Sequence, residues 1–135
     1  MITYLTSPAG LTLDQLPGFF AEWGDPPTAA TLLRILQGSS YVVLAQATDT
    51  QQIVGYITAV SDGVSCAYIP HLEVHPAWRG QGIGGTLVRR MAEQLAHLYM
   101  VDLICDENLI PFYEQYGFRP YTAMIQRNYA RQRCD

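Results

Sequence analysis

The alternation of apolar and polar positions is clearest between Ser65 and Tyr99, where it predicts a strand, a glycine-rich loop and a helix. Apolar and aromatic residues run through 68–74 as in a buried strand. Pro76 is expected to end that strand, because proline cannot donate a hydrogen bond to a neighbouring strand. Beyond the glycines, apolar residues recur at the spacing of an amphipathic helix: Ile83, Leu87, Val88, Met91, Leu95 and Leu98.

The first forty residues predict one strand and two helices. Residues 2–5 are expected to form the strand. Thr28 is expected to cap the second helix, which ends near Gly38. An apolar stripe predicts the first helix despite the Pro17-Gly18 pair inside it: Leu13, Leu16, Phe19, Phe20 and Trp23.

Further strands are predicted at 41–45 and 53–60, so that three strands in succession lead to the glycines, as in an antiparallel meander. Residues 100–105 predict a strand parallel to 68–74, since a helix joins the two and such crossovers are right-handed.

The C-terminal part predicts a short helix and then a strand. Residues 106–108 suit the start of a helix that Gly117 ends, and a last strand region is expected from Phe118, including 123–129.

The composition is that of one folded domain over residues 1–135, with 49% hydrophobic and 15% charged residues. No apolar run is long enough to span a membrane, and the first residues lack the basic region and apolar core of a secretory signal. We therefore expect a cytoplasmic protein without a membrane partner. The net charge of −4 argues against nucleic acid as the main partner.

The cysteines and histidines do not form a metal-binding pattern. Cys66, Cys105 and Cys134 are odd in number and lack C-x-x-C spacing, as expected of reduced thiols in a cytosolic protein. His71 and His75 lie on or beside a predicted strand and are expected to flank a groove, so no metal is expected.

The loop of residues 79–85 predicts an anion site. The first turn of a helix has backbone N–H groups without partners and carries partial positive charge. Glycines without side chains let a phosphate or pyrophosphate reach those N–H groups. The spacing Gly80, Gly82, Gly85 is also that of a dinucleotide fingerprint, but residues 75–79 separate the strand from the first glycine and little chain follows.

The run L-E-V-H-P-A-W-R-G-Q-G-I-G resembles the acetyl-CoA-binding motif of the GNAT N-acetyltransferase superfamily, a strand followed by Arg/Gln-x-x-Gly-x-Gly/Ala. The resemblance implies that the loop holds the CoA pyrophosphate and that the backbone of 72–74 lines the pantetheine arm and acetyl group. The expected acetyl-CoA-binding residues are Leu72, Glu73, Val74, Arg79, Gly80, Gln81, Gly82, Ile83, Gly84, Gly85 and Asn108.

A second resemblance lies near the C-terminus. P-F-Y-E-Q-Y-G-F matches the family's C-terminal signature, and residues 105–120 are similar to the corresponding stretch of the serotonin (arylalkylamine) N-acetyltransferases. The family implies an α/β (α+β) fold with a mixed, mostly antiparallel central sheet and helices on both faces. Acetyl-CoA would lie where the strands at 68–74 and 100–105 splay apart.

The family's chemistry needs groups that move protons. An alkylamine with a pKa near that of lysine, ~10.4, must lose a proton before it attacks a thioester. By resemblance, Tyr113 is the general acid for the leaving thiolate; otherwise it is a core residue, for which Phe112 and Tyr116 are better candidates. Glu73 or His71 could be the base if the strand is regular, but a bulge would alter their faces, and a water chain remains open.

The predicted activity is acetyl-CoA-dependent N-acetylation of a primary amine by direct attack. The family builds its acceptor pocket partly from the first two helices, which here contain Phe20 and Trp23, expected to face Tyr68. Both could instead be ordinary core residues. The acceptor is a small molecule or a peptide or protein amine, and the protein is a monomer or homodimer. The alternatives are a catalytically inactive CoA-binding regulatory domain and, less favoured, a dinucleotide-binding oxidoreductase.

Overall fold

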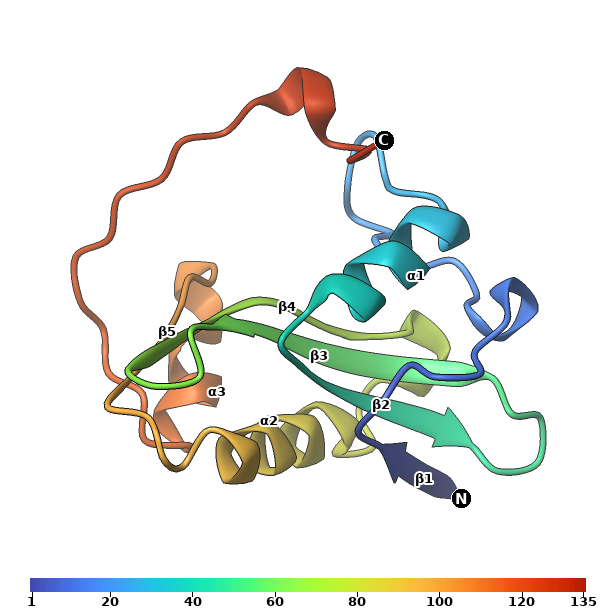
Figure 1. Ribbon diagram of the computed structural model, residues 1–135, viewed down its shortest axis with the longest axis horizontal. Coiled ribbons are helices and arrows are strands. Elements are labelled where there is room, and N and C mark those ends of the chain that lie inside the picture. Colours follow the sequence, from blue (N-terminus) through green and yellow to red (C-terminus); the bar gives the residue numbers. More distant parts are fainter.

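The computed structural model describes all 135 residues and contains one five-stranded mixed sheet with helices on both faces (Figure 1). The strands follow chain order across the sheet: β1 (Ile2–Leu5), β2 (Tyr41–Ala47), β3 (Ile53–Ser61), β4 (Cys66–Val74) and β5 (Met100–Leu103). Strands β1 to β4 pair antiparallel, and β4 pairs with β5 in parallel. The predicted meander and the predicted parallel pair are both confirmed.

Each face of the sheet buries its own apolar cluster. Helices α2 (Ile83–Gln94) and α3 (Ile110–Glu114) lie on one face and pack with it in a cluster of fourteen buried residues that includes Val43 and Ile57 of the sheet. Helix α1 (Ala29–Gly38) lies on the other face, in a cluster of nine buried residues that includes Leu44 and Tyr56 of the sheet. Alternate residues of a strand point to opposite faces, so burial on both faces explains the unbroken apolar runs in β2 and β3.

Gly55 in β3 allows α2 to approach the sheet closely. A Cβ at this position would lie 3.2 Å from Leu87 Cδ1, 3.3 Å from Ile83 Cγ2 and 3.2 Å from the Glu73 carbonyl oxygen. A larger residue would therefore push the first turn of α2 away from β3 and β4. This contact holds the beginning of α2 beside the end of β4.

Several predicted boundaries are confirmed or shift by a few residues. Thr28 caps α1, its hydroxyl oxygen accepting the Thr31 N–H at 3.2 Å. Helix α2 ends at Gln94 rather than near Leu98, because the chain turns at Leu95. The strand expected over 100–105 ends at Leu103.

The helix expected over the apolar stripe from Leu13 to Trp23 is wrong. Only a 3₁₀ turn at Leu13–Gln15 forms, because Pro17 disrupts helical hydrogen bonding and Gly18 disfavours a helix interior. The side chains of Leu16, Phe19 and Phe20 are nevertheless buried against α1 and the sheet. The stripe correctly indicated burial but not the backbone conformation.

The strand expected from Phe118 through 123–129 is also wrong. Gly117 turns with φ 88°, and the chain then leaves the sheet and runs round the outside of the molecule (Figure 1). Residues 119–131 are all exposed and have no strand partner. Strand-like composition could not form a strand here because no neighbouring strand lies beside it.

Two further features bear on the predicted class. The longest helix, α2, has 12 residues, and no helix is long and apolar enough to cross a bilayer. All three cysteines are free thiols, and no three His, Cys, Asp or Glu side chains gather as metal ligands.

Candidate functional site

The parallel strands β4 and β5 separate before β4 ends. Their pairing runs from Cys66 with Met100 to Ile69 with Leu103, where β5 stops. Strand β4 continues to Val74, so its last five residues have no partner on this side. This confirms the splayed parallel pair and leaves the backbone of 72–74 beside an opening in the sheet.

The loop after β4 is fixed by contacts with its own strand and with a distant segment. The Arg79 Nε donates to the Val74 carbonyl oxygen at 3.0 Å, and its guanidinium pairs with Glu22 at 3.0 Å. Exposed ion pairs of this kind contribute little stability. The bond to Val74 nevertheless aligns the predicted loop with the open end of β4.

The predicted anion site has the backbone that an anion requires. Gly80 and Gly82 have φ of 79° and 80°, in the left-handed region that side-chain-bearing residues avoid. Gly82 is the N-cap of α2 and offers no capping side chain. The amides of 83–85 precede the first intrahelical bond, from Thr86 to Gly82, and are therefore free for a ligand.

The other predicted loop residues lie around this turn. Gly84 leaves room, since a Cβ there would only touch Phe112 and Val74, at 3.8 Å each. At Gly85 a Cβ would overlap the Tyr116 hydroxyl, so a side chain there would require the Tyr116 ring to move. Gln81 is exposed, whereas the Ile83 side chain is buried and leaves only its amide for a ligand. These residues fit a pyrophosphate group.

Asn108 lies apart from the glycine loop. It sits in a 3₁₀ turn, Glu107–Leu109, just after β5, and its side chain is exposed. It can reach the site only from the β5 side of the opening.

An open hollow of about 310 Å³ lies on the α1 side of β4. His71 and Glu73 both line it. They pair with Thr58 and Tyr56 of β3 without a register shift between them, so they lie on one face of β4, as expected. The register shift between β3 and β4 falls opposite Thr58 to Val60, before this stretch, and leaves the faces of 71–73 unchanged. The walls are Phe20, Trp23, Tyr56, Pro70 and Leu72.

Tyr68 does not line the hollow, and the prediction that it faces Phe20 and Trp23 is not supported. It pairs with Asp102 in the other half of β4, where the strand is still bonded to β5. Phe20 and Trp23 do line it, with ring centroids 4.6 Å apart. Phe20 is also a core residue, and the acceptor-pocket role of both side chains stays a prediction.

Glu73 is held by a strained segment. Its Oε1 accepts the Phe20 N–H at 2.6 Å, and the Tyr56 hydroxyl donates to Oε2 at 3.5 Å. Phe20 has φ 63°, which costs a bulky residue energy and persists only where the surroundings hold it. Burial raises the pKa of the Glu73 carboxyl above its ordinary value. A carboxyl of this kind accepts a proton more readily than an exposed one.

The imidazole ring of His71 lies close to aromatic side chains. Its ring centroid lies 5.9 Å from that of Phe20 and 6.1 Å from that of Trp23. Burial lowers the pKa of His71, because the charged imidazolium is poorly solvated there. The imidazole is thus neutral at pH 7 and adds no positive charge beside Glu73.

Tyr113 is 9% exposed, whereas Phe112 and Tyr116 are only partly buried. The expectation that Phe112 and Tyr116 were the better core candidates is therefore wrong. Helix α3 turns Tyr113 toward the α2 core, and burial and the nearby Cys105 raise its pKa to about 12. Tyr113 consequently keeps its proton at neutral pH.

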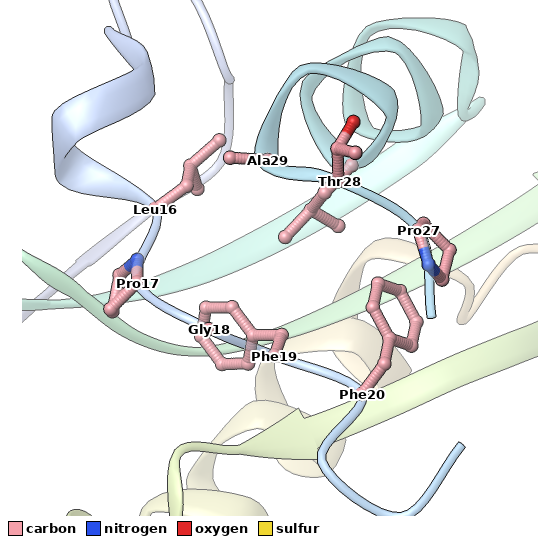
Figure 2. Close-up of a pocket in the computed structure, with 9 residues that line it drawn as sticks. Leu16, Pro17, Gly18, Phe19, Phe20, Pro27, Thr28 and Ala29 are labelled. Carbon is pink, nitrogen blue, oxygen red and sulfur yellow. The ribbon is translucent and has the colours of Figure 1, made fainter. Parts of the chain in front are cut away.

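A second hollow, of about 340 Å³, lies beside the first (Figure 2). Figure 2 shows Leu16, Pro17 and Phe19 on one side and Pro27, Thr28 and Ala29 at the start of α1 on the other. Phe20 lines both hollows, but no ionisable side chain lines this one. It lacks groups for proton transfer.

Tyr56 lines the hollow around Glu73, and the sequence analysis did not suggest it as a site residue. It is fully buried and touches Glu73, and burial and the Glu73 carboxylate raise the pKa of its hydroxyl. The sequence signal is that Tyr56 is the one aromatic residue in the strand Ile53–Ser61.

Fold and site together define a class. A mixed sheet with a splayed parallel pair, and a glycine-capped helix at the splay, are the features that the acetyl-CoA motif implied. The model of the Acetyltransferase (GNAT) family matches residues 10–118. The chain belongs to this family.

Individual relatives agree with this assignment. The chain is 29% identical over 112 residues to GCN5-related N-acetyltransferase 1, chloroplastic, of Arabidopsis thaliana, covering 81% of this chain and 57% of the relative. A crystal structure from Deinococcus radiodurans, provisionally described as an acetyltransferase, is 45% identical with TM-score 0.94, covering 98% of this chain and 92% of that one. A GNAT family acetyltransferase from Streptococcus pneumoniae has TM-score 0.75 at 29% identity, over 95% and 98% of the two chains.

The dinucleotide-binding oxidoreductase is excluded by the same findings. Its fold needs a mainly parallel sheet, whereas β1 to β4 are antiparallel. The G-x-G-x-x-G spacing instead belongs to a GNAT loop.

Proposed function

We propose that this protein transfers an acetyl group from acetyl-CoA to a primary amine, which attacks the thioester directly. One observation carries the proposal: the glycine-capped start of α2 and the Glu73 hollow both adjoin the unpaired end of β4. A donor held by the loop would bring its acetyl group along 72–74, within reach of an amine in the hollow.

The donor side would bind the pyrophosphate through backbone amides. The unpaired amides at the start of α2 and the left-handed turn at Gly80 and Gly82 support this. By resemblance, the Val74 amide would stabilise the oxyanion that forms when the amine adds to the carbonyl carbon.

Glu73 is our choice for the base. Glu73 would take one proton from the ammonium group, directly or through water, and the neutral amine nitrogen would then bond to the carbonyl carbon while the C=O electron pair moves to oxygen. The second nitrogen proton would leave to water as the tetrahedral intermediate collapses. The carbon–sulfur bond then breaks, and the electron pair leaves on sulfur. The raised pKa of Glu73 and its place in the hollow support this role, and neutral His71 is the alternative acceptor.

Tyr113 would donate a hydrogen bond to the departing sulfur. Its pKa of about 12 exceeds the ~8.5 typical of a thiol, so full proton transfer from tyrosine to thiolate is uphill. The lasting proton of the thiol would come from water. Tyr113 would lower the barrier by stabilising the charge on sulfur as it forms.

The acceptor that the hollow suits is an amine with an apolar or aromatic body. Trp23, Phe20 and Leu72 offer apolar surface, and Glu73 offers the one carboxylate. A cationic amine would bind there and pass its proton to that carboxylate.

The three free thiols support the expected reducing, cytoplasmic compartment.

The test is thiol release from acetyl-CoA with a panel of aliphatic, aromatic and peptide amines, alongside calorimetry of CoA binding. We expect amine-dependent thiol release, fastest for amines with an aromatic or branched body. Trp23→Ala should change the relative rates across the panel, whereas Trp78→Ala, outside the hollow, should leave them unchanged. CoA binding without thiol release for any amine would favour the regulatory domain instead.

A further inference from the structure

The C-terminal segment of residues 119–128, here called the arm, is a strand-like stretch without a strand partner. No backbone hydrogen bond within the chain involves residues 119–127. The arm nevertheless carries large apolar side chains in water: Tyr121 is 86% and Met124 94% exposed, and Ile125 is also exposed. Such contiguous apolar exposure is characteristic of an interaction surface.

The arm is held at both ends, away from its own sheet. At its start, Phe118 packs against the α2 core and the Tyr113 ring. Beyond its end, Gln132 accepts the Asp25 N–H at 2.9 Å, and Arg133 lies 3.9 Å from the Asp25 carboxylate. Figure 1 shows the arm bowed outward between these two attachments. With both ends fixed in this way, the arm does not lie along β5 of its own chain.

Strand β5 is an edge strand, and like the arm it has backbone hydrogen-bonding groups without a partner strand. The sheet order ends at β5, so one side of its backbone has no partner strand. Met100 at its start and Ile104, just after its end, are each 43% exposed. Free edges of this kind pair readily with an added strand.

Charge distinguishes β5 from β1, the other free edge. The arm, residues 119–128, contains two arginines and no acid, a net charge of +2, whereas residues 100–118 contain four acids and no base, a net charge of −4. The acids are Asp102, Asp106, Glu107 and Glu114. Residues 1–5 of β1 carry no charged side chain. The basic arm therefore complements the β5 side and not the β1 side.

We propose that the arm binds a second copy of this chain, lying along β5 of that copy while the other arm lies along β5 of the first. The arrangement is a two-fold symmetric dimer in which the arm of each copy adds a sixth strand to the sheet of the other, next to β5. Each arm obtains the backbone hydrogen bonds that it lacks within its own chain. Tyr121, Met124 and Ile125 lose their contact with water, which supplies the hydrophobic part of the association.

The experiment measures mass and amide exchange on the full chain. Light scattering with size exclusion should give twice the chain mass of 15.1 kDa. Hydrogen exchange should be slow at the amides of 119–127 that pair with β5, because none of the amides in this segment is hydrogen-bonded to the backbone within its own chain. Dilution below the dissociation constant should restore fast exchange in the arm and in β5 together.

Two matched pairs of variants identify the surface. Met124→Asp should weaken dimerisation at least about tenfold, ~1.4 kcal/mol, whereas Val64→Asp, equally a change at an exposed apolar residue, should not. Arg127→Glu should also weaken it, whereas Arg34→Glu, on exposed α1, should not. Because Met124, Val64, Arg127 and Arg34 are all exposed, all four variants should keep the wild-type Tm of the monomer.

Three results would overturn the proposal. The first is a monomer at concentrations of about 100 µM, since a specific interface should associate well below that. The second is a dimer whose arm exchanges at the free rate, which would place the interface elsewhere. The third is a protected arm in a monomer, which would mean that it folds onto its own β5.

Discussion

The two sides of the candidate site are built in opposite ways. On the donor side, the loop of 79–85 offers backbone amides, and the glycines that give it its left-handed turn lie within a single run of sequence. On the acceptor side, Glu73 is placed by Phe20 and Tyr56, which are 53 and 17 residues away. The difference teaches that a site made of backbone can be recognised locally, whereas a site made of side chains depends on long-range packing.

The largest expected effect concerns the donor side. Gly84→Glu should abolish measurable CoA binding, because a carboxylate at the start of α2 would repel the pyrophosphate and fill its space. Calorimetric titration of the folded variant with CoA is the measurement.

Gly84→Ala is the control for that substitution. A Cβ at this position makes only ordinary contacts, at 3.8 Å, so the variant should fold and retain most of its affinity. Equal CoA affinity in wild type and Gly84→Glu would mean that the amides are not the pyrophosphate site.

The next effect concerns the acceptor side. Glu73→Gln keeps an oxygen for the Phe20 N–H but cannot take a proton, so kcat should fall by ~10²–10⁴-fold. The acidic limb of the pH–rate profile should also disappear. Steady-state kinetics across pH, with chemistry shown to limit turnover, provides the measurement.

His71→Asn separates the two candidate bases. If Glu73 is the base, His71→Asn should lower kcat much less than Glu73→Gln. The reverse order, with a normal pH profile in Glu73→Gln, would assign the proton to His71.

A smaller effect is expected at Tyr113, which would stabilise the leaving sulfur with one hydrogen bond. Tyr113→Phe should lower kcat by ~10–100-fold, the range that a hydrogen bond to a charged group provides, with CoA affinity unchanged. The ring remains, so the packing in the α2 core should survive. Tyr116→Phe, on the same side of the molecule, should be close to neutral, and a neutral Tyr113→Phe would leave Tyr113 a core residue only.

The smallest effect is on stability and tests how Glu73 is held. Because burial raises its pKa above the ordinary 4.5, the folded protein binds this proton more tightly than the unfolded chain. The free energy of unfolding of wild type, relative to Glu73→Gln, should therefore fall as pH rises from ~4 through the folded-state pKa. Urea unfolding across pH gives this difference. A difference that rises with pH would mean that the Phe20 N–H stabilises the carboxylate anion more than burial destabilises it.

Local patterns predicted much of the fold. The strands near 41–45, 53–60 and 68–74, the Thr28 cap and α2 were correctly anticipated, since each depends on side-chain periodicity or on a capping residue within a few positions. The local patterns gave wrong predictions at the Leu13–Trp23 stripe and after Phe118. In both places the apolar pattern indicates that side chains favour burial or strand pairing, but it does not determine the backbone conformation.

The sequence by itself determined the family, the sheet order around the glycine loop and the amides that would meet an anion, because glycine spacing and strand–helix alternation act locally. Only the tertiary structure decided which side chains surround Glu73. Tyr56 was missed because its role arises from cross-strand pairing with Glu73. Tyr68 was misplaced because β5 occupies its half of β4. The physical reason is that burial, and with it a raised or lowered pKa, is a property of the assembled neighbours and not of a residue's place in the chain.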